Sequence, residues 1–215
     1  EKFVAKLSST TETWQWAAEY TDTSWGYVLA ITVDHNDNIY VTGKHNNYLF
    51  IGKLDSSGSW IWTENSVLGV GYDIDVDSSG DLYVTGSFED TVNFGGTSLT
   101  SNGVTDIFVV KLDSDGNWIR AEKAGGPQTD NGDVNSGTSQ FSWYTSNAGI
   151  TIGSNDAAFV TGWIGGPANN WAAFGSHNLT SSAYSSIFVA KFSIDSDSDG
   201  WDDDDAFGPT SGDDH

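Results

Sequence analysis

The sequence predicts an all-β fold, a β-propeller-type array of about three four-stranded antiparallel blades plus one orphan N-terminal strand. A phrase Phe-x-x-Lys, followed by Leu or Phe, occurs at residues 3–7, 50–54, 108–112 and 188–192. A second phrase, Val-Thr-Gly, recurs between these copies. Self-similarity of this kind indicates one supersecondary unit that is used several times. No window shows the sustained apolar period of an amphipathic helix.

Each unit contains four short strand signals. In the middle unit, residues 73–76 alternate polar and apolar side chains, and the mostly apolar residues 82–85 follow after the turn 77–81. Asp, Ser and Gly suit that turn because they tolerate positive φ or bond to their own backbone. Two strand signals around so short a turn predict a hairpin. The Phe/Lys phrase is the third strand, and a strand with Trp, such as residues 118–120, is the fourth.

Counted from the Trp strands, the predicted blades span residues 14–54, 60–112 and 118–192, with the leading strand 3–7. Closed propellers typically have about 4–8 blades, so this array cannot close alone. Either a longer chain supplies the remaining blades, or chains associate so that a strand of one completes a sheet of its neighbour. Residues 1–192 are thus expected to form the blades and residues 193–215 an acidic tail.

Several linked phrases resemble a known repeat. The Phe/Lys phrase and residues 76–86, 93–100 and 113–118 are similar to the SBBP-type β-propeller repeat, over about residues 1–192. Such repeats occur in large exported proteins of bacteria and archaea. The resemblance implies a propeller and export, but it implies little about activity, because propellers host enzymes, lectins and protein-binding platforms alike.

Composition excludes several classes of function. The chain has 215 residues, 8 Lys and Arg against 30 Asp and Glu, and no Cys. A net charge of -22 repels nucleic acid and anionic lipid. Without Cys there is no disulfide framework and no thiolate zinc site. No apolar run reaches the roughly 20 residues that span a bilayer. We therefore expect neither nucleic-acid binding nor membrane insertion. This composition fits a secreted fragment and a soluble cytoplasmic chain alike, and the acidic segment described next favours a protein that is secreted or at the cell surface.

The segment 195–205 carries the clearest chemistry. Asp occupies its positions 1, 3 and 5 and Gly its position 6, as in the opening of an EF-hand loop. Oxygen ligands at alternate positions around a glycine turn are what Ca²⁺ requires. Position 12 is Ala206 rather than Glu, and no helices are predicted beside it, so an EF-hand is not expected.

This segment instead resembles the calcium loops of thrombospondin type-three repeats. The resemblance implies a Trp201 carbonyl ligand, with Asp204 or Asp205 completing the shell. It implies these side-chain ligands: Asp195, Asp197, Asp199 and Asp203. Only one copy is present, and the cysteine of those repeats is absent. The alternative is a solvated acidic linker.

Aromatic residues in loops are candidates for ligand binding. The third predicted blade carries an insertion at about residues 125–148 that is rich in Gly, Ser, Thr and Asn. Long loops on a rigid scaffold often carry function. The candidates for sugar stacking or protein binding are Trp143, Tyr144, Trp163 and Trp171. Alternatively, these aromatics only hold their loops against the blade. Asn178 begins a glycosylation-type sequon, Asn-Leu-Thr.

The repeated lysines and tryptophans also allow two interpretations. The lysines of the Phe/Lys phrases could line an anion site, or each could lay its stem over apolar surface and pair with an Asp of a neighbouring turn, such as Asp34 or Asp77. The first Trp of each fourth strand, at positions 14, 60 and 118, is expected to pack between blades because it keeps the repeat period.

The predicted function is a non-enzymatic, calcium-stabilised structural, adhesion or assembly module of the cell exterior. It would belong to a larger surface protein or a head-to-tail assembly. The histidines show no metal-binding spacing, and no nucleophile elbow or phosphate loop is present. The first alternative is a lectin-like, carbohydrate-binding propeller. The second is a glycosidase fragment, since the many acids offer carboxylate pairs.

Overall fold

The computed structural model describes residues 2–22, 24–127, 148–165, 170–181 and 185–192. Every regular element in these ranges is a β-strand, and the paired strands run antiparallel. The predicted all-β fold is therefore confirmed. Over the same ranges, no helix has the length and hydrophobicity needed to cross a membrane.

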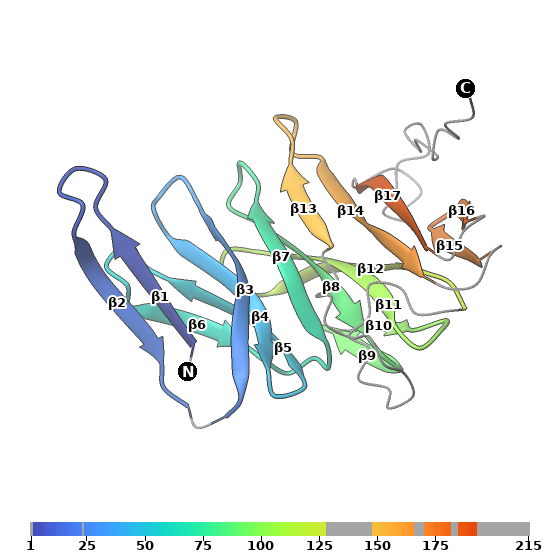
Figure 1. The fold of residues 1–215 in the computed structure, drawn as a ribbon, viewed down its shortest axis with the longest axis horizontal. Helices are drawn as coiled ribbons and strands as arrows, with labels where there is room; N and C mark the ends of the chain where they lie inside the picture. The colour runs from blue at the N-terminus through green and yellow to red at the C-terminus, as the bar shows by residue number, and fades with distance from the viewer. Residues whose placement is uncertain (1, 23, 128–147, 166–169, 182–184, 193–215) are drawn as a thin grey trace.

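Four sheets follow one another along the chain (Figure 1). The first contains β1 (Lys2–Leu7) and β2 (Trp14–Tyr20). The second contains β3 (Gly26–Val33), β4 (Ile39–His45), β5 (Tyr48–Leu54) and β6 (Trp60–Glu64). The third contains β7 (Val70–Val76), β8 (Leu82–Phe88), β11 (Asp106–Leu112) and β12 (Trp118–Gly125). The fourth contains β13 (Gly149–Ile152), β14 (Ala158–Gly165) and β17 (Ser185–Phe192).

Two inserted hairpins precede the third strand of the third and fourth sheets. The first consists of β9 (Thr91–Phe94) and β10 (Thr97–Thr100), and the second of β15 (Asn170–Phe174) and β16 (His177–Ser181). Phe94 of the first hairpin contacts the Phe108 ring, and Phe174 of the second contacts the Phe188 ring. β15 also pairs with the end of β12, which extends the third sheet.

The predicted orphan strand is wrong, because β1 pairs with β2 over its whole length. Likewise β6 pairs with β5 and β12 with β11, so each Trp strand belongs to the sheet of the preceding Phe/Lys strand rather than beginning a new blade. The sheet boundaries therefore differ from the ranges 14–54, 60–112 and 118–192. The turns 55–59 and 113–117 are closed by backbone hydrogen bonds from Asp55 to Ser59 and from Asp113 to Asn117, and a closed turn of this kind joins its two flanking strands as a hairpin.

The turns share one geometry, which explains their composition. In the turn 77–81, the Asp77 N–H donates to the Asp81 carbonyl and the Gly80 N–H donates to the Asp77 carbonyl. Asp77 Oδ1 accepts from the N–H groups of Ser79 and Asp81 at 2.9 Å each. Gly80 has φ 87°, a conformation that favours glycine. The turns 34–38, 55–59 and 113–117 repeat this pattern, so Asp and Gly are explained here by backbone geometry.

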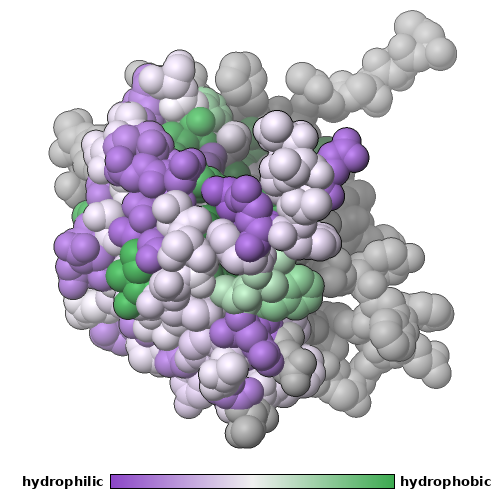
Figure 2. All heavy atoms as spheres, turned by 90° about the vertical axis from the view of Figure 1, so that its left-hand side faces the viewer, coloured by the Kyte–Doolittle hydropathy of each residue, from purple (hydrophilic) through white to green (hydrophobic). Residues whose placement is uncertain are grey.

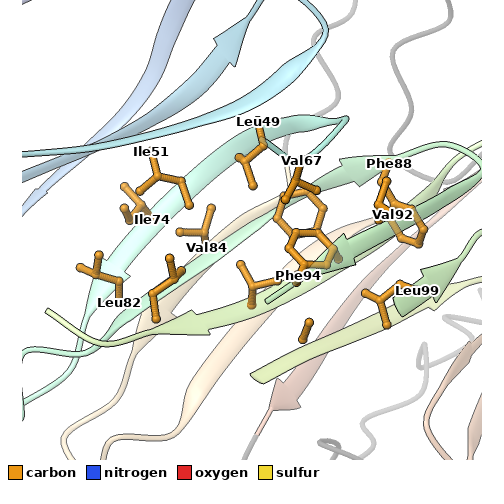
Figure 3. Packing of buried hydrophobic residues seen from close by; sticks show 14 of the residues in the cluster. Leu49, Ile51, Val67, Ile74, Leu82, Val84, Phe88, Val92, Phe94 and Leu99 are labelled. Atoms are coloured by element: carbon orange, nitrogen blue, oxygen red, sulfur yellow. The ribbon is translucent and has the colours of Figure 1, made fainter. Parts of the chain in front are cut away.

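Neighbouring sheets pack face to face through apolar side chains. β7 lies between β3 and β13, and the three strands follow one another across the molecule (Figure 1). The largest buried cluster joins the second sheet to the third, where Ile51 of β5, Ile74 of β7 and Val84 of β8 point toward one another (Figure 3). A second cluster joins the third sheet to the fourth, and a third joins the first to the second.

Polar ties between sheets supplement this apolar contact. Asp75 of β7 accepts a hydrogen bond from Thr32 of β3 at 3.3 Å and from the Ile152 N–H of β13 at 2.8 Å. Asp73 accepts from the Ile150 N–H at 2.9 Å. These two carboxylates pair with backbone donors that would otherwise lie unsatisfied beside a neighbouring sheet.

Trp16 of β2 and Trp62 of β6 lie over turns of the next sheet, whereas Trp14, which was expected to pack between blades, is 69% exposed. The Trp16 indole donates to the Ser56 carbonyl, and the Trp62 indole donates to the Ser114 carbonyl. A Cβ on Gly58 would overlap the Trp16 ring and one on Gly116 would crowd the Trp62 ring, so glycine at each position has a packing reason as well. Trp60 donates in the other direction, to the Glu19 carbonyl of the first sheet.

The repeated lysines differ from sheet to sheet. Lys111 pairs with Asp77 at 3.1 Å and Asp81 at 3.0 Å, as expected for a lysine that meets a turn aspartate. Burial alone would lower the pKa of Lys111, but hydrogen bonds with Tyr83, Asp81 and Asp77 raise it. Lys53 instead donates to the Ser114 carbonyl at 2.8 Å. Lys6 makes no hydrogen bond or ion pair within the part of the chain that the structure describes.

Candidate functional site

Several predicted site residues lie outside the described ranges. These are the six predicted calcium ligands Asp195, Asp197, Asp199, Trp201, Asp203 and Asp205, and the loop aromatics Trp143 and Tyr144. They remain predictions. Elsewhere, in the described residues, no group of three or more Asp, Glu or His side chains is gathered closely enough to hold a metal ion.

The other predicted residues lie in two separate sheets. Trp163 is half-buried in β14, and it lies opposite Ile187 of the neighbouring strand β17. Trp171 is exposed in β15, opposite Thr180 of β16. Asn178 is exposed in β16, a position that leaves its side chain accessible. The structure thus places Trp163 and Trp171 on different hairpins, in different sheets.

One buried carboxyl stands apart from the aspartates of the turns. Asp106 is fully buried, and its Oδ1 has no hydrogen-bond partner among the described residues. Its Oδ2 accepts from the Asn102 N–H at 2.9 Å and lies 3.9 Å from Lys123 Nζ. Burial raises the pKa of Asp106, although the Asn102 hydrogen bond and the Lys123 charge act in the opposite direction. With no exposed surface, this carboxyl has no contact with solvent in the described conformation.

One register repeats in three sheets, and it defines which positions are equivalent. Val-Thr-Gly of the second strand always lies opposite the Phe/Lys phrase of the third: Gly43 pairs with Phe50, Gly86 with Phe108 and Gly162 with Phe188. The aromatic residue before Val pairs with the Lys in each sheet. Residues that occupy the same place in this register can therefore be compared directly.

The fourth sheet presents an uncovered apolar face, which we call the C-terminal face. It consists of Phe159, Ile187 and Val189, which are 38%, 83% and 56% exposed. In the third sheet, the residues equivalent to Ile187 and Val189 are Ile107 and Val109, and both are fully buried. They are buried because the fourth sheet packs on them, whereas no described sheet packs on the fourth.

The other end of the array also has an uncovered surface, which we call the N-terminal face. Its residues are Phe3, Leu7, Leu29, Ile31 and Val33, all of them exposed. Ile31 is 56% exposed, but Ile74 at the same place in β7 is only 3% exposed. The strands that cover Ile74 are β4 and β5 of the preceding sheet. The first sheet contains no equivalents of β3 and β4, so Ile31 remains uncovered.

A groove lies where the two strands that the first sheet lacks would pack. It encloses about 390 Å³ and is lined by residues 2–5 of β1, residues 27–31 of β3 and Val41. β1 pairs only with β2 and so has a free edge, whereas β5 and β11 have partners on both sides. Figure 2 shows this end of the molecule, where hydrophobic surface reaches solvent among polar residues. An unpaired strand beside an apolar groove can accept an added strand.

These faces carry the candidate site, and sequence reasoning only partly found them. The expectation that blades must be completed from outside pointed to association but not to any residues. Ile31, Ile74 and Ile150 occupy the same repeat position and look alike in the sequence. Their exposure depends on whether a neighbouring sheet is present, which a local pattern does not contain.

Comparison with known proteins adds no relative. No protein-family model matches the chain, and a search of curated proteins finds no significant similarity. The geometry of the chain itself is therefore what indicates its function.

Asp106 generates a prediction of pH dependence. Its pKa in the folded protein is raised above the unfolded value, so the fold loses stability as the pH rises above the unfolded pKa, and the loss is complete above the folded pKa. Below the unfolded pKa both states are protonated and the penalty vanishes. We expect Asp106→Asn to raise the thermal midpoint near pH 8, with a gain that shrinks as the pH falls toward 4, in thermal melts at several pH values.

Asp113→Asn is the matched control. Hydrogen bonds from the Asn117 side chain and backbone lower the pKa of Asp113, so its carboxylate stabilises the fold above the unfolded pKa and loses that contribution as the pH falls. Asp113→Asn should lower the midpoint near pH 8 and converge with the wild type in acid. Equal pH dependence of the two variants would contradict this assignment.

Proposed function

We propose that the four sheets are blades of a β-propeller-type array and that the chain is a structural and assembly module. The module acts at the cell exterior, is not an enzyme, and associates through its terminal faces. The SBBP-type phrases and the face-to-face packing of successive sheets support the propeller geometry.

The observation that carries this proposal is the contrast between equivalent residues. Ile187 is 83% exposed where Ile107 is fully buried, and Ile31 is 56% exposed where Ile74 is 3% exposed. Apolar surface of this kind is favourably removed from water, and contiguous exposed patches mark interaction sites. A face that repeats an internal packing surface is already shaped for another sheet. Its natural cover is a further blade, either from a longer chain or from a second copy.

We further propose that the segment 195–205 binds Ca²⁺ and stabilises the C-terminal part of the module. Seven carboxylates in eleven residues repel one another unless a cation is present. Sites of this kind in extracellular modules have dissociation constants of about 10⁻⁴–10⁻³ M, which suits millimolar calcium outside cells.

A second candidate function is carbohydrate binding. Trp171 is 40% exposed on β15, and an exposed indole can stack on a sugar ring. Loss of glycan retention in Trp171→Ala, with retention preserved in Trp25→Ala, would favour it; Trp25 is 65% exposed and lies outside the predicted ligand-binding set.

The assembly proposal predicts that the particle mass rises with concentration. In sedimentation velocity, the wild-type chain should form species larger than one 23.1 kDa chain. The double variant Ile187→Asp with Val189→Asp should remain monomeric, because charges on the C-terminal face oppose its burial.

Ile61→Asp with Ile119→Asp is the control for this experiment. These isoleucines are also about half exposed but lie on the fourth strands β6 and β12, outside both terminal faces. The control should associate like the wild type. A wild-type chain that stays monomeric at every concentration, or equal dissociation of both double variants, would contradict the proposal.

The calcium proposal predicts measurable binding by the intact chain. Isothermal titration of chelator-treated protein should show heat at submillimolar to millimolar Ca²⁺. Asp195→Asn with Asp199→Asn should abolish it. Asp213→Asn with Asp214→Asn removes the same charge outside the loop and should leave it in place. Absence of heat in the wild type would contradict the proposal.

A further inference from the structure

We propose that the free edge of β1 and the groove beside it accept a two-stranded β-hairpin whose turn carries Asp and whose second strand reads aromatic-Val-Thr-Gly. This inference rests on the proposed assembly function and names the chemistry of the partner at the N-terminal face. Three features of the structure define that partner.

The first feature is the backbone register. In the second, third and fourth sheets, the Phe/Lys strand pairs with a second strand that places Gly opposite Phe and an aromatic residue opposite Lys. β1 carries the same phrase, from Phe3 to Lys6, but pairs only with β2. In an antiparallel pair, alternate residues direct their N–H and C=O groups away from the partner strand. The free side of β1 thus offers donors and acceptors in the spacing that β5 and β11 offer to β4 and β8.

The second feature is the shape of the groove. A strand beside β1 and another beyond it would correspond to β4 and β3 of the second sheet. They would lie over Leu29 and Ile31 of β3 as β4 and β3 lie against β7. Two of the internal sheet contacts already show this arrangement, because β7 packs on β3 and β4 and β13 packs on β7 and β8. The added hairpin would continue that interface by one more sheet.

The third feature is charge. Lys111 is held by Asp77 and Asp81, which belong to the turn of the β7–β8 hairpin, and its ammonium lies 4.9 Å from the centre of the Tyr83 ring. Lys6 occupies the same place in β1, is half-buried, and has neither carboxylate nor ring as a partner in the described residues. A hairpin with an acidic turn and an aromatic residue opposite Lys6 would supply both. The third sheet thus favours an acidic turn in the partner, whereas the aromatic residue opposite the Lys is found in the second sheet as well, where Lys53 lies over the Tyr40 ring.

The test uses the full chain and a synthetic peptide of residues 70–88, which is the chain's own hairpin of this type. The chain carries Ile187→Asp and Val189→Asp, so that association through the C-terminal face does not interfere. Hydrogen exchange of the β1 amides should slow when the peptide is added, while amides of β5, already paired on both sides, stay unchanged. A peptide of residues 48–64 is the control, because this hairpin has third- and fourth-strand phrases and should leave β1 unprotected.

A double-mutant cycle tests the charge. Lys6→Gln in the chain, or Asp77→Asn with Asp81→Asn in the peptide, should each weaken binding by about tenfold, since hydrogen bonds to charged groups are worth more than one kcal/mol. The combined changes should cost little more than either alone. If the losses of affinity from the two changes add, Lys6 does not contact the two aspartates, and the assigned partner is wrong.

Two other results would overturn the proposal. One is equal protection of the β1 amides from hydrogen exchange by both peptides, which would show nonspecific binding to the groove. The other is protection of β1 in the wild-type chain that rises with concentration and is not increased by the peptide, which would assign the edge to a second copy. The latter result leaves the assembly function standing, whereas a monomeric wild-type chain whose β1 no peptide protects would contradict both.

Discussion

Apolar contact between successive sheets is the interaction on which the rest of this structure depends. Each sheet alone has two apolar faces, and each becomes stable by burying those faces against its neighbours. Ile51, Ile74 and Val84 meet between the second and third sheets, and the same arrangement recurs between the third and fourth. An array built in this way always leaves one face uncovered at each end. The exposed isoleucines at the two ends are the direct consequence of the packing rule that buries their equivalents inside.

Polar groups follow the same repeat and determine how the sheets are spaced. Trp16 and Trp62 reach turns of the next sheet, and Asp75 connects strands of three sheets. The hydroxyls of Thr42, Thr85 and Thr161 each donate to the carbonyl of the Phe in the adjacent Phe/Lys strand. This Phe lies opposite the Gly that follows the Thr. Buried polar groups with such partners favour a single arrangement, because a shifted sheet would leave them unsatisfied. The proposed partner at β1 must obey the same constraints, and this is why its sequence can be specified.

The strands and turns could be predicted from the sequence, because both depend on local chemistry. Gly58, Gly80 and Gly116 stand where the backbone needs positive φ, and they mark the turn positions reliably. The sheet to which a Trp strand belongs could not be predicted. In the sequence, each Trp strand lies between a Phe/Lys strand and the first strand of the next unit, and it could pair with either. The structure pairs each Trp strand with the Phe/Lys strand before it, and backbone hydrogen bonds from Asp55 to Ser59 and from Asp113 to Asn117 close the turns between them. The difference between Ile31 and Ile74 is likewise not local, and the calcium ligands 195–205 and the aromatics Trp143 and Tyr144 lie beyond the described residues.

The central claim is that equivalent positions differ only in whether a sheet covers them. The most direct measurement is the free energy of unfolding of Ile74→Ser and of Ile31→Ser, by urea denaturation of the monomer. Ile74 is 3% exposed and Ile31 is 56% exposed, so the account predicts a loss of about 3–5 kcal/mol for the first and about 1 kcal/mol or less for the second. Equal losses would show that the face of β3 is already covered in the isolated chain, and this would contradict the account.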